Sequence, residues 1–317
     1  MFTPSPTVGH IRAEPVPMAY TRKTVPSEVF VTSWRQLTAA SHTVTAEWPT
    51  SHSFYTPGPG LYDPSVLAET VRQALALLSH TAHDVPLNYR LGWEHFETSL
   101  APAALRTRPE PASVTLTVTH TKSVRRRLGS VHLTAHITAI CNGWPLGTVK
   151  VGYSAHPPAI YDRLRGAHAN ALEATAQALP LVAPLPQVLR GGVSHPEDVV
   201  LSDAGLSHGW QLRVDVANSS FFDHPHDHVP GMLLLEAASQ AIHVLSGAPH
   251  TVAATLDIRF NRYVELDSPC LIEATPLVRE DGGSVSTDVT GRQNGHEVFS
   301  ARMTALEVAC ERGVLKM

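Results

Sequence analysis

The chain has 317 residues, of which 43% are hydrophobic and 16% are charged, and its formal net charge is −4. This length corresponds to about two average domains, and the apolar content excludes both an intrinsically disordered chain and one that is membrane-embedded throughout. The charge excludes nucleic-acid binding driven by bulk positive charge, and three cysteines are too few for a disulfide framework.

Targeting signals are not evident in the sequence. No apolar run approaches the ~20 residues of a membrane-spanning helix, and the segment 1–20 lacks the apolar core of a signal peptide. We therefore expect a cytoplasmic protein with neither a membrane nor a nucleic-acid partner.

The first half of the chain is expected to hold one long helix followed by strands. Apolar residues recur at helical spacing across 64–80, with Pro64 at the N-terminal position. Alternating β-branched runs over 113–120 and 130–140 predict strands. Asn142-Gly143 predicts a tight hairpin turn.

The second half shows the same order of elements. Residues 231–246 predict a strongly apolar helix that begins after Pro230, and such a helix is buried on most sides. A second hairpin turn is expected at Asn294-Gly295. Strands are predicted over 252–259, 271–278, 284–290 and 297–306.

Equivalent residues of the two halves keep one constant spacing. Three pairs are each 167 positions apart, namely Phe54 and Phe221, Glu69 and Glu236, and Gln73 and Gln240. Three equal offsets together with the two hairpin turns predict a tandem duplication.

The duplication sets the expected domain organisation. We expect an N-terminal extension (1–24), a first repeat (25–156), a linker (157–195) and a second repeat (196–317). The linker is rich in Pro, Ala and Gly and is predicted to hold one short helix near 167–178. Each repeat is predicted to be α+β, with an antiparallel sheet wrapped around a central helix, because the sheet then buries the apolar helix.

The loop before the second helix carries a distinctive phrase, FFDHPHDHVPGMLLLE, at 221–236. Together with LAETVRQ at 67–73 and RFNRYVELD at 259–267, it resembles the AfsA family, the A-factor biosynthesis proteins with two hot-dog repeats. The resemblance covers about residues 25–305 and implies a tandem, or double, hot-dog fold.

The resemblance also implies an activity. AfsA-type proteins are acyltransferases that join a β-ketoacyl group, carried as a thioester on acyl carrier protein, to the hydroxyl of dihydroxyacetone phosphate. The resulting 3-oxoalkanoyl ester is a precursor of γ-butyrolactone, furan or butenolide signalling molecules. The resemblance implies no cofactor.

Two alternatives stay open. One is a hot-dog dehydratase or thioesterase, which would use no phosphate acceptor. The other is a non-catalytic protein that binds an acyl ligand. Ser239 favours this second alternative, because the family usually carries Arg there and Ser cannot replace a guanidinium group.

Three residues are candidates for acid–base chemistry. Glu236 lies on an otherwise apolar helix, where desolvation raises the pKa of a carboxyl group. Glu69 occupies the equivalent position of the first copy. His224 is expected to assist, by analogy with hot-dog dehydratases that place a His from the preceding loop beside an acid on the helix. For each residue the alternative is a structural role.

Other residues are candidates for substrate binding. The helix that begins at Gly231 presents unpaired N–H groups to a developing oxyanion, and Arg72 is expected to bind phosphate. The remaining candidates are His52, Gln240 and Arg259.

Two further stretches of the sequence carry charged or metal-ligating residues. The basic stretch 122–127 is either a solvated turn or a docking site for an acidic carrier protein or a phosphate. The loop histidines at 224, 226 and 228 make zinc conceivable. No other ligand cluster is visible, and we expect no metal.

Overall fold

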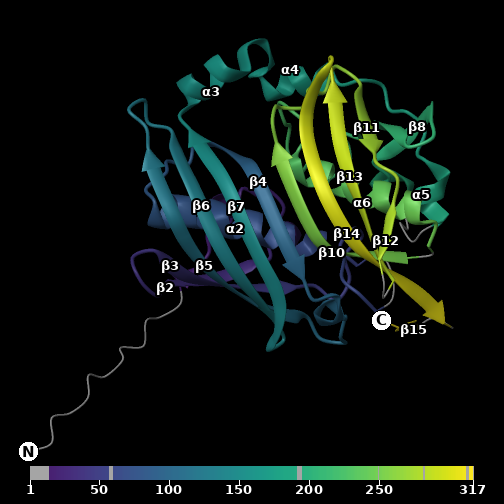
Figure 1. The fold of residues 1–317 in the computed structure, drawn as a ribbon. Helices are drawn as coiled ribbons and strands as arrows, with labels where there is room; N and C mark the ends of the chain where they lie inside the picture. Colours follow the sequence, from purple (N-terminus) through teal and green to yellow (C-terminus); the bar gives the residue numbers. More distant parts are fainter. Residues whose placement is uncertain are drawn as a thin grey trace, which may run out of the picture.

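The computed structural model describes residues 14–56, 60–190, 195–248, 250–280, 283–311 and 314–316. Two similar halves are joined edge to edge into one continuous antiparallel sheet, with a long helix behind each half (Figure 1). The first half consists of β2 (Val31–Gln36), β3 (Ser41–Trp48), α2 (Ser65–Ala82), β4 (Arg90–Leu100), β5 (Ala112–Arg125), β6 (Val131–Cys141) and β7 (Trp144–His156). The second consists of β8 (Leu201–Leu206), β9 (Gly209–Leu212), α6 (Gly231–Ser246), β10 (His250–Phe260), β11 (Cys270–Ala274), β13 (Ser284–Gln293) and β14 (His296–Glu311).

The strand order is symmetric about the junction of the two halves. It reads β2-β3-β5-β6-β7-β4 and then β10-β14-β13-β11-β9-β8, so the second half repeats the first in reverse. Strands β4 and β10 pair antiparallel, with Phe96 opposite Ile258. This arrangement is the tandem hot-dog fold expected from the sequence, with one local two-fold axis at the β4–β10 pair.

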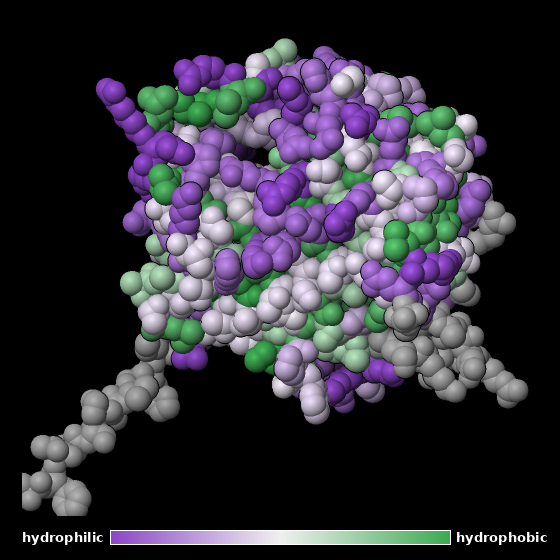
Figure 2. Space-filling model, in the orientation of Figure 1, coloured by the Kyte–Doolittle hydropathy of each residue, from purple (hydrophilic) through white to green (hydrophobic). Residues whose placement is uncertain are grey.

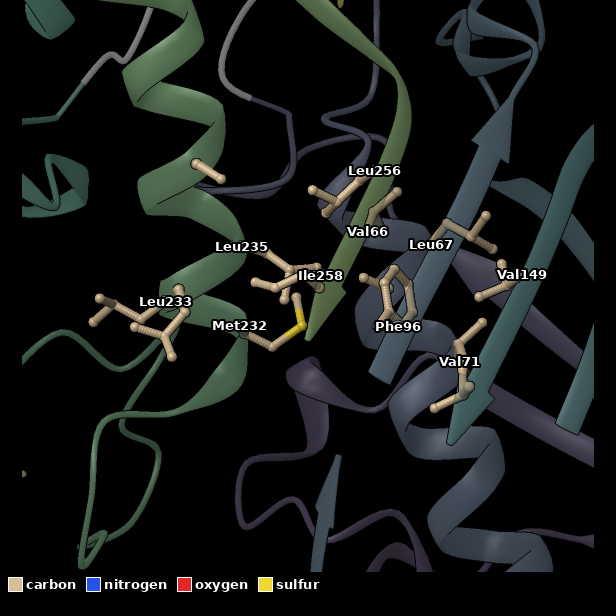
Figure 3. Packing of buried hydrophobic residues seen from close by; sticks show 14 of the residues in the cluster. Val66, Leu67, Val71, Phe96, Val149, Met232, Leu233, Leu235, Leu256 and Ile258 are labelled. Atoms are coloured by element: carbon tan, nitrogen blue, oxygen red, sulfur yellow. The ribbon is translucent and has the colours of Figure 1, made fainter. Parts of the chain in front are cut away.

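The two central helices are buried because they are apolar on most sides. In α2 nearly every residue from Val66 to Ser79 is buried, and α6 is buried from Met232 to Ala238. Figure 3 shows side chains from α2, α6, β4 and β10 gathered between the helices. The opposite face of the sheet is covered mostly by hydrophilic and intermediate residues (Figure 2).

The predicted helices and hairpin turns are confirmed. The helix expected at 231–246 spans those residues, and the one expected at 64–80 begins one residue later and ends two residues later. The two turns have matching left-handed backbones, with φ of 50° and 82° at Asn142 and Gly143 and of 51° and 76° at Asn294 and Gly295. These angles are those of a two-residue type I′ hairpin turn.

Some predicted elements were wrong or missed. The strand expected over 271–278 divides into β11 and β12 (Val278–Glu280), because Pro276 has no N–H to donate to a sheet. Strand β4 was missed, since Phe96 is its one fully buried residue and no alternating pattern results.

The segments outside the two repeats also contain regular structure. The linker holds more than the single helix expected near 167–178. Its helices are α3 (Pro158–Arg165), α4 (Ala171–Ala176) and α5 (Pro186–Arg190). The other short elements are β1 (Glu14–Pro15), α1 (Met18–Thr21) and β15 (Val314–Lys316). None of the helices in the described ranges has the length and apolar character needed to cross a bilayer.

Ile258 tests how far the fold depends on the core between the helices. It is 0% exposed on the face of β10 that meets the helices, whereas its neighbour Arg259 is exposed on the other face. We expect Ile258→Ala to lower the free energy of unfolding by about 2–5 kcal/mol through lost burial and a cavity. Arg259→Ala, the matched control, should change it by less than about 0.5 kcal/mol. Urea unfolding measures both, and equal effects would contradict this packing.

Candidate active site

Each central helix carries a buried glutamate that is held by a glutamine one turn further along. Gln73 donates from Nε2 to Glu69 Oε1 at 2.7 Å. Gln240 donates in the same way to Glu236 Oε1, also at 2.7 Å. The constant spacing in the sequence therefore corresponds to one repeated structural unit.

The rest of each glutamine amide is used to hold the chain that enters the repeat. Gln240 Nε2 also donates to the carbonyl of Asp198, and its Oε1 accepts from Val200 N–H at 2.9 Å. Gln73 makes the same pair of bonds with the carbonyl of Glu28 and the N–H of Phe30. The donors and acceptor of Gln240 are thus engaged within the protein, which favours a positioning role over the expected substrate contact.

The carboxyl of Glu69 is surrounded by cations. Arg72 donates to it twice, from Nε to Oε2 and from Nη2 to Oε1, each at 2.7 Å, and Lys23 Nζ lies 3.4 Å from Oε1. Burial alone would raise the pKa of Glu69, but these cations outweigh it and lower the pKa to about 2. Glu69 is therefore ionised and is a weak base. This environment suits a role in orienting Arg72 better than a role in proton transfer.

Glu236 has the opposite environment. It is 6% exposed, and Ser239 stands where the first copy has Arg72. Burial, and then the nearby carboxylates Asp63 and Asp198, raise its pKa well above the ordinary value. The pKa values of the two equivalent glutamates are thus shifted in opposite directions, downward for Glu69 and upward for Glu236.

The loop before α6 brings a histidine–aspartate pair to the Glu69 side. His224 Nδ1 lies 2.6 Å from Asp223 Oδ1, and the backbone N–H of Thr24 donates to Asp223 Oδ2 at 3.0 Å. Burial alone would raise the pKa of Asp223. Its hydrogen bond to His224 and the positive charge of Lys23 outweigh burial, so this pKa lies below its ordinary value. The ionised carboxylate accepts a hydrogen bond from Nδ1–H, which leaves Nε2 as the ring nitrogen of His224 that can accept a hydrogen bond.

His226 packs against this pair, with its ring centroid 4.3 Å from that of His224. Burial and then the adjacent histidines lower the pKa of His226 to about 3, so it is neutral near pH 7. Asp223, His224 and His226 have ligand atoms within 4.8 Å of one another, as a metal site requires. However, Lys23 and Arg72 add positive charge here and oppose the binding of a cation.

Helix α3 of the linker anchors the same loop. Arg165 donates to Asp227 Oδ2 at 2.8 Å and to both carboxylate oxygens of Glu265. Its guanidinium also lies 4.3 Å from the centre of the Tyr263 ring. This buried arginine fixes the loop that carries His224 to the strand connection after β10.

The N-termini of the two central helices differ in a way that distinguishes the two sides. At the start of α2, Asp63 Oδ1 accepts from Ser65 N–H at 2.8 Å, so a carboxylate occupies the first turn. At the start of α6 the preceding residue is Pro230, and no side chain caps the helix. Leu233 N–H donates to the carbonyl of Pro230 at 3.0 Å, so among the described residues the N–H groups of Gly231 and Met232 are the ones left without a partner, as binding of an oxyanion or phosphate requires.

Gly231 begins this open helix end. A Cβ added there would lie 3.5 Å from the Phe260 ring, which is an ordinary contact. Space within the protein therefore does not require a glycine at this position. Gly231 matters because it is the first residue of the helix.

Two other predicted site residues have different surroundings. His52 Nδ1 accepts from the backbone N–H groups of Phe54 and Tyr55, and its Nε2 lies 3.1 Å from Glu28 Oε1. Both ring nitrogens are therefore engaged within the protein, Nδ1 with the loop of His52 and Nε2 with Glu28. Arg259 is exposed on the sheet face that points away from the helices, so the structure does not bring it to either glutamate.

Sequence reasoning missed the contribution of the N-terminal segment. Lys23 is 7% exposed beside Glu69, and Thr24 binds Asp223. Both belong to the stretch 1–24 that was expected to be an extension, and a single lysine there gives no signal. The basic stretch 122–127 lies at the exposed hairpin between β5 and β6.

The fold and this site together define a duplicated hot-dog protein in which Arg72 and Lys23 surround one buried glutamate and no such cation accompanies the other. The family model of AfsA, described as an A-factor biosynthesis hotdog domain, matches residues 9–156 and 183–309. The chain belongs to this family.

Curated relatives cover most of the chain. It is 36% identical over 288 residues to a 2-oxo-3-(phosphooxy)propyl 3-oxoalkanoate synthase of Streptomyces virginiae, covering 90% of this chain and 95% of that one. Enzymes of the same name from Streptomyces coelicolor and Streptomyces griseus are 35% identical, over 298 and 288 residues. The alignments cover 90% of this chain in both cases, and 90% and 94% of the relatives.

The opposite pKa shifts give opposite pH dependences of stability. The pKa of Glu69 is about 2, so its contribution is present above the unfolded pKa of about 4.3 and is lost as pH falls towards 2. Glu236 has a raised pKa, so wild type loses stability as pH rises above about 4.3.

We therefore compare Glu69→Gln and Glu236→Gln with wild type by urea unfolding across the acid range. Relative to wild type, Glu69→Gln should be less stable by about 3 kcal/mol near neutral pH, because Arg72 and Lys23 lose their partner. This deficit should shrink as pH falls. Glu236→Gln should gain on wild type as pH rises. Parallel pH profiles for the two variants would contradict the assignment.

Proposed function

We propose that this protein is an acyltransferase that transfers a 3-oxoalkanoyl group from an acyl carrier protein thioester to dihydroxyacetone phosphate. The relatives' names describe the product, because the 2-oxo-3-(phosphooxy)propyl group is dihydroxyacetone phosphate esterified at its hydroxyl. The observation that carries the proposal is the Glu69 side, where a fixed arginine, a histidine–aspartate pair and the loop leading to an open helix end lie together.

Arg72 is the proposed phosphate ligand. Glu69 holds Nε and Nη2, and Nη1 makes no hydrogen bond to the residues described. The side chain is 27% exposed, so an anion reaches it from solvent. A guanidinium held in one orientation binds phosphate with little further loss of entropy.

His224 is the proposed general base. Its Nε2 takes the proton from the acceptor hydroxyl as that oxygen attacks the thioester carbonyl carbon. The N–H groups of Gly231 and Met232 at the start of α6 stabilise the oxyanion that forms. The carbon–sulfur bond then breaks, and the departing thiolate takes the proton back from His224. Asp223 holds the imidazole in the required tautomer throughout.

The Glu236 side does not offer the same chemistry. Asp63 occupies the N-terminus of α2, and Ser239 replaces the arginine. The transfer is therefore assigned to the Glu69 side alone, with Glu69 and Gln240 as positioning residues. Docking of the acidic carrier protein on the basic stretch 122–127 stays a prediction.

The direct test is to incubate the protein with a β-ketoacyl carrier protein, with and without dihydroxyacetone phosphate, and to follow products by mass spectrometry. We expect an ester that forms only when the acceptor is present. Hydrolysis independent of the acceptor would instead indicate a thioesterase, and acyl binding without turnover would indicate a binding protein.

In the same assay, His224→Gln should lower kcat by about 10²–10⁴-fold, which is the usual contribution of a general base. His136→Gln is the control, because His136 is exposed on the outer face of the sheet. An unchanged kcat in His224→Gln would remove this residue from the mechanism.

Arg72→Lys keeps the charge but loses the bidentate geometry. We expect kcat/KM for dihydroxyacetone phosphate to fall about tenfold or more, as for a lost charged hydrogen bond. With unphosphorylated dihydroxyacetone, wild type and variant should differ by less than about threefold, since no phosphate contact is lost. Equal losses with both acceptors would show that Arg72 does not bind the phosphate.

A further inference from the structure

A cluster of metal-ligating side chains lies on the outer face of the sheet, at the pair of strands that joins the two repeats. His95 and Glu97 of β4 and Asp257 of β10 each offer one ligand atom, and these atoms lie within 4.8 Å of one another. The closest pair is His95 Nε2 and Asp257 Oδ1, which are 2.7 Å apart. An ion bound at about 2 Å from each ligand needs ligand atoms roughly 3–4 Å apart, so small side-chain rotations suffice to surround it.

The register of the two strands places these ligands together. Asp257 lies opposite Glu97 in the β4–β10 pair, and the exposed Arg259 lies opposite His95. His95 and Glu97 are two residues apart and therefore share one face of the sheet, whereas Phe96 between them is buried on the other face. The cluster is thus built from two paired strands, and each repeat contributes at least one ligand.

The cluster is open to solvent. On β7 the residue opposite His95 is Gly152, so no side chain covers the imidazole from that strand. A Cβ added at Gly152 would lie 3.8 Å from the Cβ of His95, which shows how close that position is. The side chains of His95, Glu97 and Asp257 are 23%, 39% and 47% exposed, so an ion and its water ligands reach them.

The charge around the cluster leaves room for a cation. Lys150 Nζ lies 2.8 Å from Glu97 Oε1 and is the cation that an ion would displace. Its side chain is 50% exposed and can turn into solvent, unlike the buried lysine beside the loop histidines. Arg302 lies opposite Asp257 on β14, but its guanidinium already binds both carboxylate oxygens of Asp288.

We propose that His95, Glu97 and Asp257 bind a divalent transition-metal ion such as Zn²⁺, which links β4 of the first repeat to β10 of the second. One imidazole and two carboxylates suit such an ion better than Mg²⁺ or Ca²⁺, which prefer oxygen ligands alone. Water completes the coordination. The site lies on the sheet face opposite to the helices that carry Glu69 and Glu236, so it does not rest on the proposed acyl transfer.

Titration of the tag-free full-length protein with Zn²⁺ by isothermal calorimetry tests the proposal. Wild type should show a saturable binding step. His95→Gln and Asp257→Asn should each weaken this step by about tenfold or more, because the loss of even a supporting group at a metal site costs 10–100-fold in affinity.

Two further variants separate a metal site from a surface ion-pair network. Lys150→Met should tighten Zn²⁺ binding by about threefold, because the ion no longer competes with an exposed ammonium group for Glu97. His132→Gln is the matched control and should bind as wild type does. His132 Nδ1 lies 3.0 Å from Glu94 Oε1 in another exposed pair across strands, and no third ligand joins that pair among the described residues.

Amide hydrogen exchange then locates the ion. Saturating Zn²⁺ should slow the exchange of β4 and β10 amides in wild type, because the ion holds the two strands together, and should not do so in His95→Gln. Absence of saturable binding, equal affinities in His95→Gln and His132→Gln, or no tightening in Lys150→Met would overturn the proposal. A binding step that survives in His95→Gln and is lost in His224→Gln would overturn it too, since the ion then lies at the loop histidines.

Discussion

The burial of one carboxyl group on each central helix is the constraint on which the two sides of this molecule depend. A carboxylate in a protein interior requires either a compensating cation or a proton. Arg72 and Lys23 lower the pKa of Glu69 to about 2, whereas burial raises the pKa of Glu236 well above its ordinary value. The same Glu–Gln unit, placed on the same fold, thereby produces two chemically different environments.

Duplication accounts for the shared framework, and a few substitutions account for the difference. Both helices are held by a glutamine that bonds the entering chain, and both lie behind one continuous sheet. Only the Glu69 side combines an arginine with the loop that leads to an uncapped helix end, and the buried Arg165 anchors that loop. Acyl transfer is therefore proposed for the Glu69 side.

The sequence predicts what local patterns and repetition encode. Helical spacing locates α2 and α6, and the 167-residue offset places Glu69 and Glu236 at equivalent positions of the two repeats. The raised pKa of Glu236 follows from its place on an apolar helix, as predicted. The full set of groups around Glu69 could not be predicted, because Lys23 and Asp223 reach the site through contacts between distant segments. Strand β4 was missed for a similar reason, since its role depends on pairing with β10 rather than on its own pattern.

The most direct test of this account is a pH titration of the two glutamate side chains by ¹³C NMR of the carboxyl carbons, assigned with Glu69→Gln and Glu236→Gln. Glu69 should remain ionised at pH 4, consistent with a pKa of about 2, whereas Glu236 should titrate well above the ordinary glutamate pKa. Two carboxyl groups that titrate together near the ordinary glutamate pKa of about 4.3 would contradict it.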